Sequence, residues 1–277
     1  IARLAGSGYR ARNVSFHLPD FIDIAINAGD DRGPFGATIG QSLPNWGRVA
    51  EESRGRTVAM SNLYTDDDSI RRRREKATLV FTSDAMAPLA DDPVAGLLGT
   101  ILHEASHNLG PSHDYRFRGK TNDEAFGGGL SSMLEELKAQ TGAMYLLAMV
   151  RGSAVIDVTL ERQAYVDSIL WSLGHIARGM VEPSGQARPY SQLSAIQIGF
   201  LLDDGALRWD PEALAADGQT HGAFSIDYDR LPAAFERMMG VVASLKAGND
   251  RRRAQALVAS YVNSDRVPQG VIRERFN

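Results

Sequence analysis

Residues 103–107 (HEASH) form the pattern H-E-x-x-H late in an apolar run of the chain. On an α-helix, residues four apart lie on one face about one turn apart, so the two imidazoles point in the same direction. Neutral imidazole nitrogens bind Zn²⁺ at about 2.0–2.1 Å. A glutamate beside the first ligand can accept the proton of a water on the metal. The pattern predicts a zinc site with His103 and His107 as ligands and Glu104 as general base.

The third metal ligand must be His, Asp or Glu, because the chain has no cysteine. Zinc sites that activate water usually have three protein ligands and one open position. Glu136, in residues 134–139 (LEELKA), lies on the next long helical segment and would complete a His₂Glu set. Its neighbour Glu135 could accept the free N–H of a ligand histidine and so fix the ring.

His113 is the alternative third ligand. Residues 103–113 match H-E-x-x-H-x-x-G-x-x-H, in which a glycine lets the chain turn so that a third histidine reaches the metal. Pro111 follows that glycine directly, and Met133 lies in a strongly helical stretch that is unsuited to a Met-turn. The sequence therefore favours Glu136 over His113. The remaining interpretation is that the histidines only pack in the core or lie on the surface.

The composition is that of a soluble globular protein of one large or two modest domains. The chain has 277 residues, of which 43% are apolar and 23% charged, and its net charge is −4. This charge gives no general attraction to nucleic acid or anionic lipid, and no apolar stretch approaches the roughly 18 residues of a membrane span. The absence of cysteine leaves both the cytoplasm and the bacterial periplasm open. Because the chain begins at Ile1, we expect a processed product or a fragment.

Apolar periodicity predicts a mainly α fold with a few short strands in the N-terminal quarter. Acidic residues at 66–68 predict the start of a helix, and Asp91-Asp92-Pro93 predicts the start of the helix that carries the zinc motif. Strands are expected within 21–26, 57–60 and 76–81. Helices are expected at 94–109, 122–150, 156–181, 190–203, 211–216, 230–247 and 250–262.

Two segments resemble the dipeptidyl-peptidase III family of zinc peptidases, especially its shorter bacterial branch. Residues 101–111 (ILHEASHNLGP) resemble that branch's five-residue zinc motif with Leu-Gly-Pro after it, and residues 132–139 (SMLEELKA) resemble its second motif, Glu-Glu-x-(Arg/Lys)-Ala-(Asp/Glu). Residues 55–63, 200–206 and 227–250 are similar to further stretches of the family.

The resemblance implies a helical zinc-peptidase catalytic lobe that faces a second lobe across a wide cleft. We expect residues 1–85 to be a mixed strand and loop segment that contributes to this cleft, and 86–277 to be the catalytic domain, or both to form one continuous domain. The family implies one zinc ion per chain and small peptides as substrates. It implies the ligands His103, His107 and Glu136, the base Glu104, and Glu135 as outer partner of a histidine. A separate N-terminal segment or lobe would complete the cleft.

The chain departs from the family at two places. The second motif ends in an acid, but Gln140 stands there and can hydrogen-bond only without charge. The family's Ala-His-Gly histidine is absent around residues 182–185, and Tyr190 is our candidate for a substitute oxyanion donor. Three functions follow: a zinc peptidase for short peptides, a catalytically impaired member that binds a peptide or a partner, or a metzincin-like endoprotease that uses His113.

Overall fold

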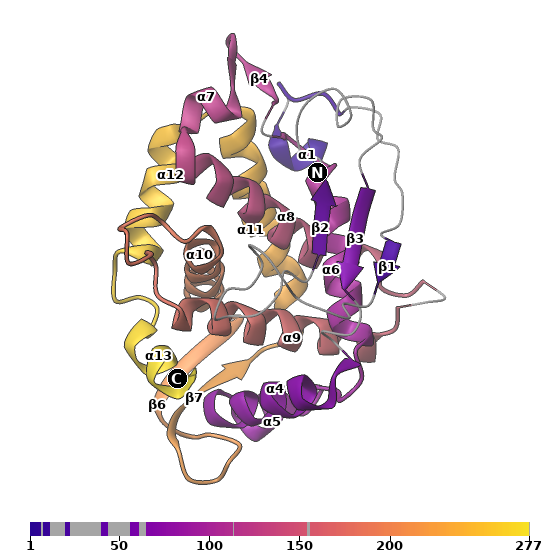
Figure 1. Ribbon diagram of the computed structural model, residues 1–277, viewed down its shortest axis with the longest axis vertical. Coiled ribbons are helices and arrows are strands. Elements are labelled where there is room, and N and C mark those ends of the chain that lie inside the picture. The colour runs from indigo at the N-terminus through magenta and orange to yellow at the C-terminus, as the bar shows by residue number, and fades with distance from the viewer. Residues whose placement is uncertain are drawn as a thin grey trace.

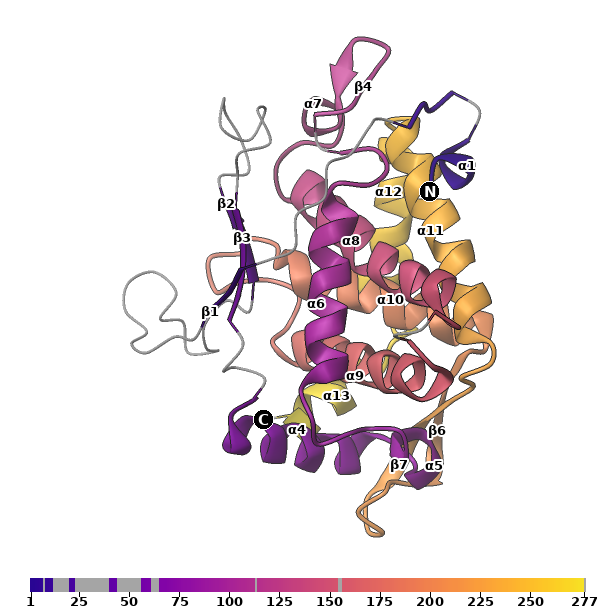
Figure 2. The ribbon, with the colours of Figure 1, turned by 90° about the vertical axis from the view of Figure 1, so that its right-hand side faces the viewer.

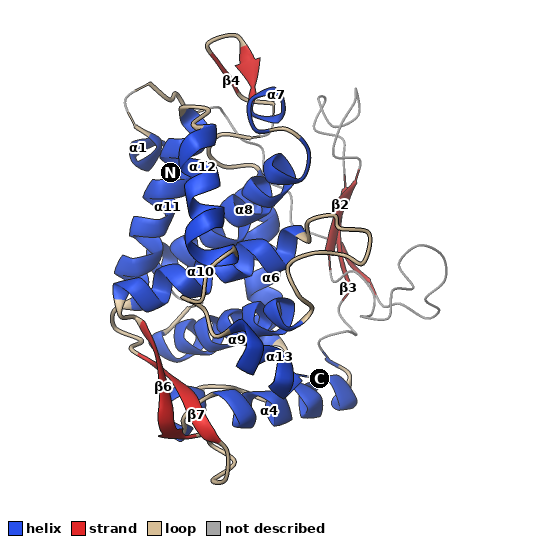
Figure 3. Ribbon diagram, turned by 90° about the vertical axis from the view of Figure 1, so that its left-hand side faces the viewer, coloured by secondary structure: helices blue, strands red, loops and turns tan. Residues whose placement is uncertain are grey.

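The computed structural model describes residues 1–6, 8–11, 20–22, 40–43, 56–60, 65–112, 114–153 and 156–276. Helices make up most of this part of the chain (Figures 1 and 3). The helices are α1 (Ala2–Ala5), α4 (Asp67–Val80), α5 (Ser83–Met86), α6 (Val94–His107), α7 (Asn122–Phe126), α8 (Gly128–Val150), α9 (Val158–Ala177), α10 (Pro189–Asp204), α11 (Leu231–Ala247), α12 (Arg251–Leu257), the π-helix η1 (Val258–Val262) and α13 (Gln269–Phe276). The strands are β1 (Asp20–Ile22), β2 (Gly40–Leu43), β3 (Arg56–Met60), β4 (Arg116–Phe117), β5 (Lys120–Thr121), β6 (Leu207–Leu214) and β7 (His221–Ile226).

Helix α8 runs through the middle of the helical part and packs against α6, α10 and α11 (Figure 1). Its side chains Met133, Leu134, Leu137, Met144 and Leu147 are fully buried. Removing one such side chain from water contributes about 1.5–3 kcal/mol to folding. Helix α8 is therefore the fixed axis against which α6 and its zinc motif are placed.

Helix α6 lies between a three-stranded sheet and the other helices (Figure 2). In this sheet β3 is the central strand, parallel to β1 and antiparallel to β2. The other strands form the hairpins β4–β5 and β6–β7, and the longest strands of the described part are β6 and β7. The expectation that strands are confined to the N-terminal quarter is therefore wrong.

The segment 76–81, predicted as a strand, is the end of helix α4. This helix begins where the acidic run predicts, because the Asp66 side chain accepts a hydrogen bond from the backbone N–H of Ser69 at 2.9 Å. It continues to Val80, and Ala77 and Val80 point into the core. A short apolar run has the same composition in a strand and in a buried helix face, so periodicity cannot separate the two.

The segment 211–216, predicted as a helix, belongs largely to strand β6. Leu207 to Asp210 pair with Ile226 to Ala223 of β7, and the register shifts between Asp210 and Leu214. This irregularity accommodates Pro211, which has no N–H for a regular ladder. The proline and the acid after it are typical of a helix start, which explains the wrong prediction.

The remaining helices are confirmed with shifted ends. The segment 122–150 divides into α7 and α8 at Gly127, whose φ of 72° is a conformation that glycine adopts without strain. The segment 250–262 divides into α12 and η1. Among the described residues, no helix combines the length and the apolar character needed to cross a bilayer. The division at residue 85 stays a prediction, although α4 and α5 add helices to the first part.

Candidate metal centre

His103 and His107 lie on the face of α6 that meets α8. The Asp92 side chain accepts a hydrogen bond from the backbone N–H of Val94, the first residue of α6, at 2.9 Å, and the helix ends at His107. The Nε2 atoms of His103 and His107 are 3.2 Å apart, and the ring centroids are 4.9 Å apart in an edge-to-face arrangement. The predicted pair of imidazoles on one helical face is confirmed.

Glu136 on α8 brings a third donor atom to the two imidazoles. Its Oε2 lies 3.3 Å from Nε2 of His103 and 3.7 Å from Nε2 of His107. Atoms bound to a tetrahedral zinc at about 2.0–2.1 Å are about 3.3–3.4 Å from one another. The three separations fit such an ion. Among the described residues, this is the group of three His, Asp or Glu side chains that could hold a metal ion.

The Oε2 atom of Glu136 is buried and accepts no hydrogen bond of normal geometry from any described residue. A buried polar atom without a partner costs about 1–3 kcal/mol, and more when it is charged. Two imidazoles and one carboxylate form a ligand set that zinc uses in hydrolytic sites. The residues present therefore fit a zinc ion.

The second nitrogen of each imidazole is held by a side chain of α8. Nδ1 of His103 lies 2.8 Å from Oε1 of Gln140, and Nδ1 of His107 lies 3.2 Å from Oε1 of Glu135. Both oxygens accept hydrogen bonds, so in the neutral rings Nδ1 carries the proton and Nε2 keeps its lone pair. Three atoms with lone pairs thus converge with no proton between them, which is an arrangement that a cation stabilises.

Gln140 is fixed on its other side by α9. Its Nε2 donates a hydrogen bond to Oγ of Ser168 at 3.1 Å, and the residue is buried. The amide therefore presents its oxygen to His103. Gln140 thus hydrogen-bonds to His103 without a negative charge.

The charges around the centre shift the pKa values of its titrating groups. Burial lowers the pKa of His103, but the close contact with Glu136 and the charge of that carboxylate raise it above the usual value. Burial raises the pKa of Glu135, but Lys138, Lys246 and His107 together hold it well below its usual range. Glu135 is therefore a carboxylate at neutral pH.

Glu104 and Tyr190 lie at the edge of this cluster. Glu104 is half-buried on α6, and no described residue hydrogen-bonds to its carboxylate. Tyr190 is the second residue of α10, and burial and the proximity of the charged Glu136 raise the pKa of its phenol. The charge of Glu104 raises this pKa further. The structure therefore brings Tyr190 to the same cluster as Glu104 and Glu136.

Other residues at this place have no clear signal in the sequence. Lys246 lies far along the chain in a helical segment, yet its Nζ is 2.9 Å from Oε2 of Glu135. Trp171 and His175 of α9 have ring centroids 5.9 Å and 5.4 Å from that of Tyr190. Only packing brings these residues together. His113, the alternative ligand, lies outside the described residues.

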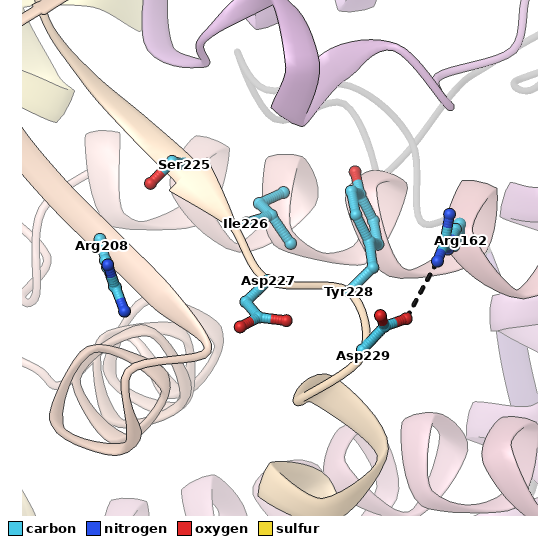
Figure 4. Close-up of a pocket in the computed structure, with 7 residues that line it drawn as sticks. All are labelled: Arg162, Arg208, Ser225, Ile226, Asp227, Tyr228 and Asp229. Atoms are coloured by element: carbon cyan, nitrogen blue, oxygen red, sulfur yellow. Dashed lines mark hydrogen bonds and ion pairs between the residues drawn. The ribbon is translucent and has the colours of Figure 1, made fainter.

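A surface hollow of about 360 Å³ is lined by residues that do not belong to the metal cluster (Figure 4). It lies where β7 leads into α11, and Arg162 of α9 forms an ion pair with Asp229 at 3.0 Å on its edge. Arg208 and Asp227 add one charge of each sign to the lining. The charges balance, so the hollow favours neither anions nor cations.

Comparison with solved structures identifies the fold. The structure superimposes on that of DPP III from Caldithrix abyssi with a TM-score of 0.75 and 22% sequence identity, over 90% of this chain and 44% of that chain. The chain has the fold of dipeptidyl peptidase III. Dipeptidyl-peptidase III from Corallococcus sp. strain EGB matches with a TM-score of 0.68 and 24% identity, over 86% of this chain and 40% of that one.

The match covers only part of the dipeptidyl-peptidase III structures, because this chain spans less than half the length of either. No protein-family model and no curated protein matches the chain. The resemblance that the zinc motif and the second motif suggest is therefore confirmed for the fold. The activity of a whole dipeptidyl peptidase III does not follow from that match.

Proposed function

We propose that this chain carries the metal centre of a zinc-dependent peptidase of the dipeptidyl-peptidase III type, which hydrolyses short peptides. The observation that carries the proposal is the convergence of three lone-pair atoms, Nε2 of His103, Nε2 of His107 and Oε2 of Glu136. The dipeptidyl-peptidase III fold supports it, and in this chain the packing of α6 on α8 brings the zinc motif and the second motif together.

His103, His107 and Glu136 would hold the zinc ion. Three protein ligands would leave the fourth coordination position of a tetrahedral zinc for water or substrate. A zinc ion in such a site supplies Lewis acidity, which lowers the pKa of water from 15.7 toward about 7. Gln140 and Glu135 keep the rings in the tautomer that ligation needs. These outer contacts make the donor set ready for a metal before any substrate binds.

Glu104 is the general base of the proposed reaction. It follows His103 directly on α6, and its carboxylate accepts no hydrogen bond from another described residue. It accepts the proton of the attacking water and then donates that proton to the leaving amine. Such a positioned base typically contributes about 10²–10⁴ in rate.

Tyr190 donates a hydrogen bond to the oxyanion that forms from the scissile carbonyl. Its raised pKa keeps the phenol protonated at neutral pH, so the hydroxyl remains a donor. Tyr190 as a whole residue is 40% exposed, so part of it is open to a substrate. The segment that carries Tyr190 is anchored to α9, because Ser191 Oγ donates to the backbone oxygen of His175 at 2.7 Å.

Turnover of a panel of dipeptidyl chromogenic amides tests this function. We expect hydrolysis by the metal-loaded protein, loss of activity with a chelator, and recovery on addition of Zn²⁺. Glu104→Gln should keep the metal and lose turnover, because it removes the base but no ligand. Activity that survives the chelator, or wild-type turnover by Glu104→Gln, would contradict the proposal.

A peptide-binding or partner-binding role is the second candidate, and Gln140 is the observation that favours it. The outer partner of His103 is an uncharged amide where the family motif has an acid. Full zinc occupancy without hydrolysis of any peptide in the panel would support this role. Cleavage of a large unfolded protein, but not of dipeptidyl amides, would instead support an endoprotease.

A further inference from the structure

Two lysines, Lys138 of α8 and Lys246 of α11, are fully buried and meet at one carboxylate. Nζ of Lys138 lies 2.8 Å from Oε1 of Glu135, and Nζ of Lys246 lies 2.9 Å from Oε2 of the same residue. Lysine is almost never fully buried unless it is paired. Two fully buried lysines paired with the single carboxylate of Glu135 are therefore unusual and require an explanation.

Lys138 and Glu135 hold His107 by its backbone and its side chain. Lys138 donates a hydrogen bond to the backbone oxygen of His107 at 3.0 Å, where α6 ends and carbonyl groups lack helical partners. Glu135 lies 3.2 Å from Nδ1 of the same residue. Both contacts that hold His107 in position and in ring orientation therefore come from α8.

Lys246 comes from a different helix and occupies the oxygen that Lys138 and His107 leave free. It lies in the last turn of α11, and its backbone oxygen accepts a hydrogen bond from Nδ2 of Asn122 at 2.9 Å. With Lys246 in place, both oxygens of Glu135 have charged or ring N–H partners. The carboxylate then has no freedom to turn away from His107.

We propose that Lys246 is a positioning residue for the metal centre, which clamps Glu135 so that His107 is already oriented as a ligand when the metal arrives. The inference rests on the proposed zinc site and extends it to α11. Partners of a ligand histidine usually change metal affinity about 10–100-fold when they are replaced. Lys246 does not contact His107 itself but acts on it through Glu135. By this contact α11 becomes part of the metal centre.

Zinc affinity of the full chain, measured by competition with a chromogenic chelator, tests this role without any substrate. Lys246→Met, which keeps the length of the side chain, should weaken zinc binding about tenfold or more. The d–d absorption spectrum of the Co²⁺-loaded variant should also differ from that of the wild type, because His107 is held less firmly. Lys246→Gln retains an N–H donor for Glu135 and should recover part of the affinity.

Two controls separate positioning from charge and from stability. Lys120→Met removes an exposed lysine, and Leu245→Ala damages the buried face of α11 next to Lys246. Neither residue forms a hydrogen bond or an ion pair with Glu135, so both variants should bind zinc as the wild type does. Equal loss of affinity in Leu245→Ala and Lys246→Met would reduce the role of Lys246 to helix stability and overturn the inference.

A double variant provides the sharpest test. If Lys246 acts through Glu135, then Lys246→Met in a Glu135→Gln background should cause no further loss of zinc affinity. Additive losses would overturn the inference. Should Lys246→Met fail to fold, Lys246→Gln in the same two backgrounds gives the same comparison. A wild-type chain that does not bind zinc would contradict the proposed function, whereas wild-type affinity in Lys246→Met would contradict only this inference.

Discussion

Gly142 of α8 lies directly against Ser106 of α6. A Cβ atom at Gly142 would lie 2.8 Å from Oγ and 2.9 Å from Cβ of Ser106, which is closer than real side chains approach. Ser106 lies next to the ligand His107, and Gly142 lies two residues beyond Gln140. The missing side chain at this contact lets the two helices approach, and the proposed metal ligands on both helices depend on that approach.

Gly142→Ala should therefore destabilise the protein by about 1–3 kcal/mol, as overpacking does in a close-packed core. It should also weaken zinc binding, because it separates the helices that carry the ligands. Thermal unfolding and chelator competition measure the two effects. Gly99→Ala on α6 is the matched control, since nothing lies within 4 Å of its added Cβ. It should be neutral or stabilising, and a Gly142→Ala variant that behaves like it would contradict the packing argument.

Glu136→Ala should remove the metal at neutral pH, because two imidazoles alone hold a divalent ion weakly. His113→Ala should retain one zinc per chain. Metal analysis of the purified variants after exhaustive dialysis gives the result directly. The opposite outcome, with metal kept in Glu136→Ala and lost in His113→Ala, would establish the metzincin-like arrangement instead.

Tyr190→Phe should lower kcat about 10²–10³-fold, since it removes one donor to the oxyanion. KM and zinc content should change little, because the ring and its contacts with Trp171 and His175 remain. Steady-state kinetics on the best amide of the panel provides the measurement. A variant that loses zinc in proportion to activity would instead assign Tyr190 to the support of Glu136.

Gln140→Glu should raise zinc affinity roughly tenfold, because a carboxylate is a stronger acceptor than an amide for Nδ1–H of His103. Ser168 can reverse its role and donate its hydroxyl to the new carboxylate, so the buried contact is kept. Competition with a chelator tests this, and turnover of the variant shows whether the uncharged residue limits catalysis. An unchanged or lower affinity would mean that the charge at residue 140 does not matter here.

The pKa of His103 gives the metal-free protein a specific pH dependence. Because Glu136 raises that pKa in the folded state, the charged pair contributes stability below the unfolded value of about 6.5 and loses it as pH rises through the folded value. Glu136→Gln lacks this contribution. With a chelator present, the Tm of the wild type should therefore exceed that of Glu136→Gln by more at about pH 6 than at about pH 8.

Zinc binding should follow the opposite trend, because the ion competes with the proton for Nε2 of His103. Zinc affinity should rise with pH over the same range, and titration in a weak buffer should detect released protons.

In the unfolding experiment, a difference in Tm between the wild type and Glu136→Gln that does not change with pH would show that His103 and Glu136 are not coupled. Glu135 does not contribute in this window, since its pKa lies well below its usual range.

The sequence by itself determined that α6 presents two histidines on one face. His103, Glu104 and His107 are related by helical spacing alone, and local rules for helix start and helix periodicity predicted that segment. The same rules placed α9, α10 and α11, because long periodic segments have a single satisfactory secondary structure. The rules failed at 76–81 and at 211–216. The short apolar run in the first segment and the proline in the second are each compatible with more than one secondary structure.

Only the tertiary structure decided which distant residues complete the centre. Glu136 was one of two candidates in the sequence, and packing of α8 on α6 places it 3.3 Å from His103. Lys246 gave no signal, because a lysine near the end of an amphipathic helix normally lies in solvent. Its charge is buried here because Glu135 offers a partner inside the core. Spacing along one helix is a local property, but the pairing of buried charges between helices exists only after the chain has folded.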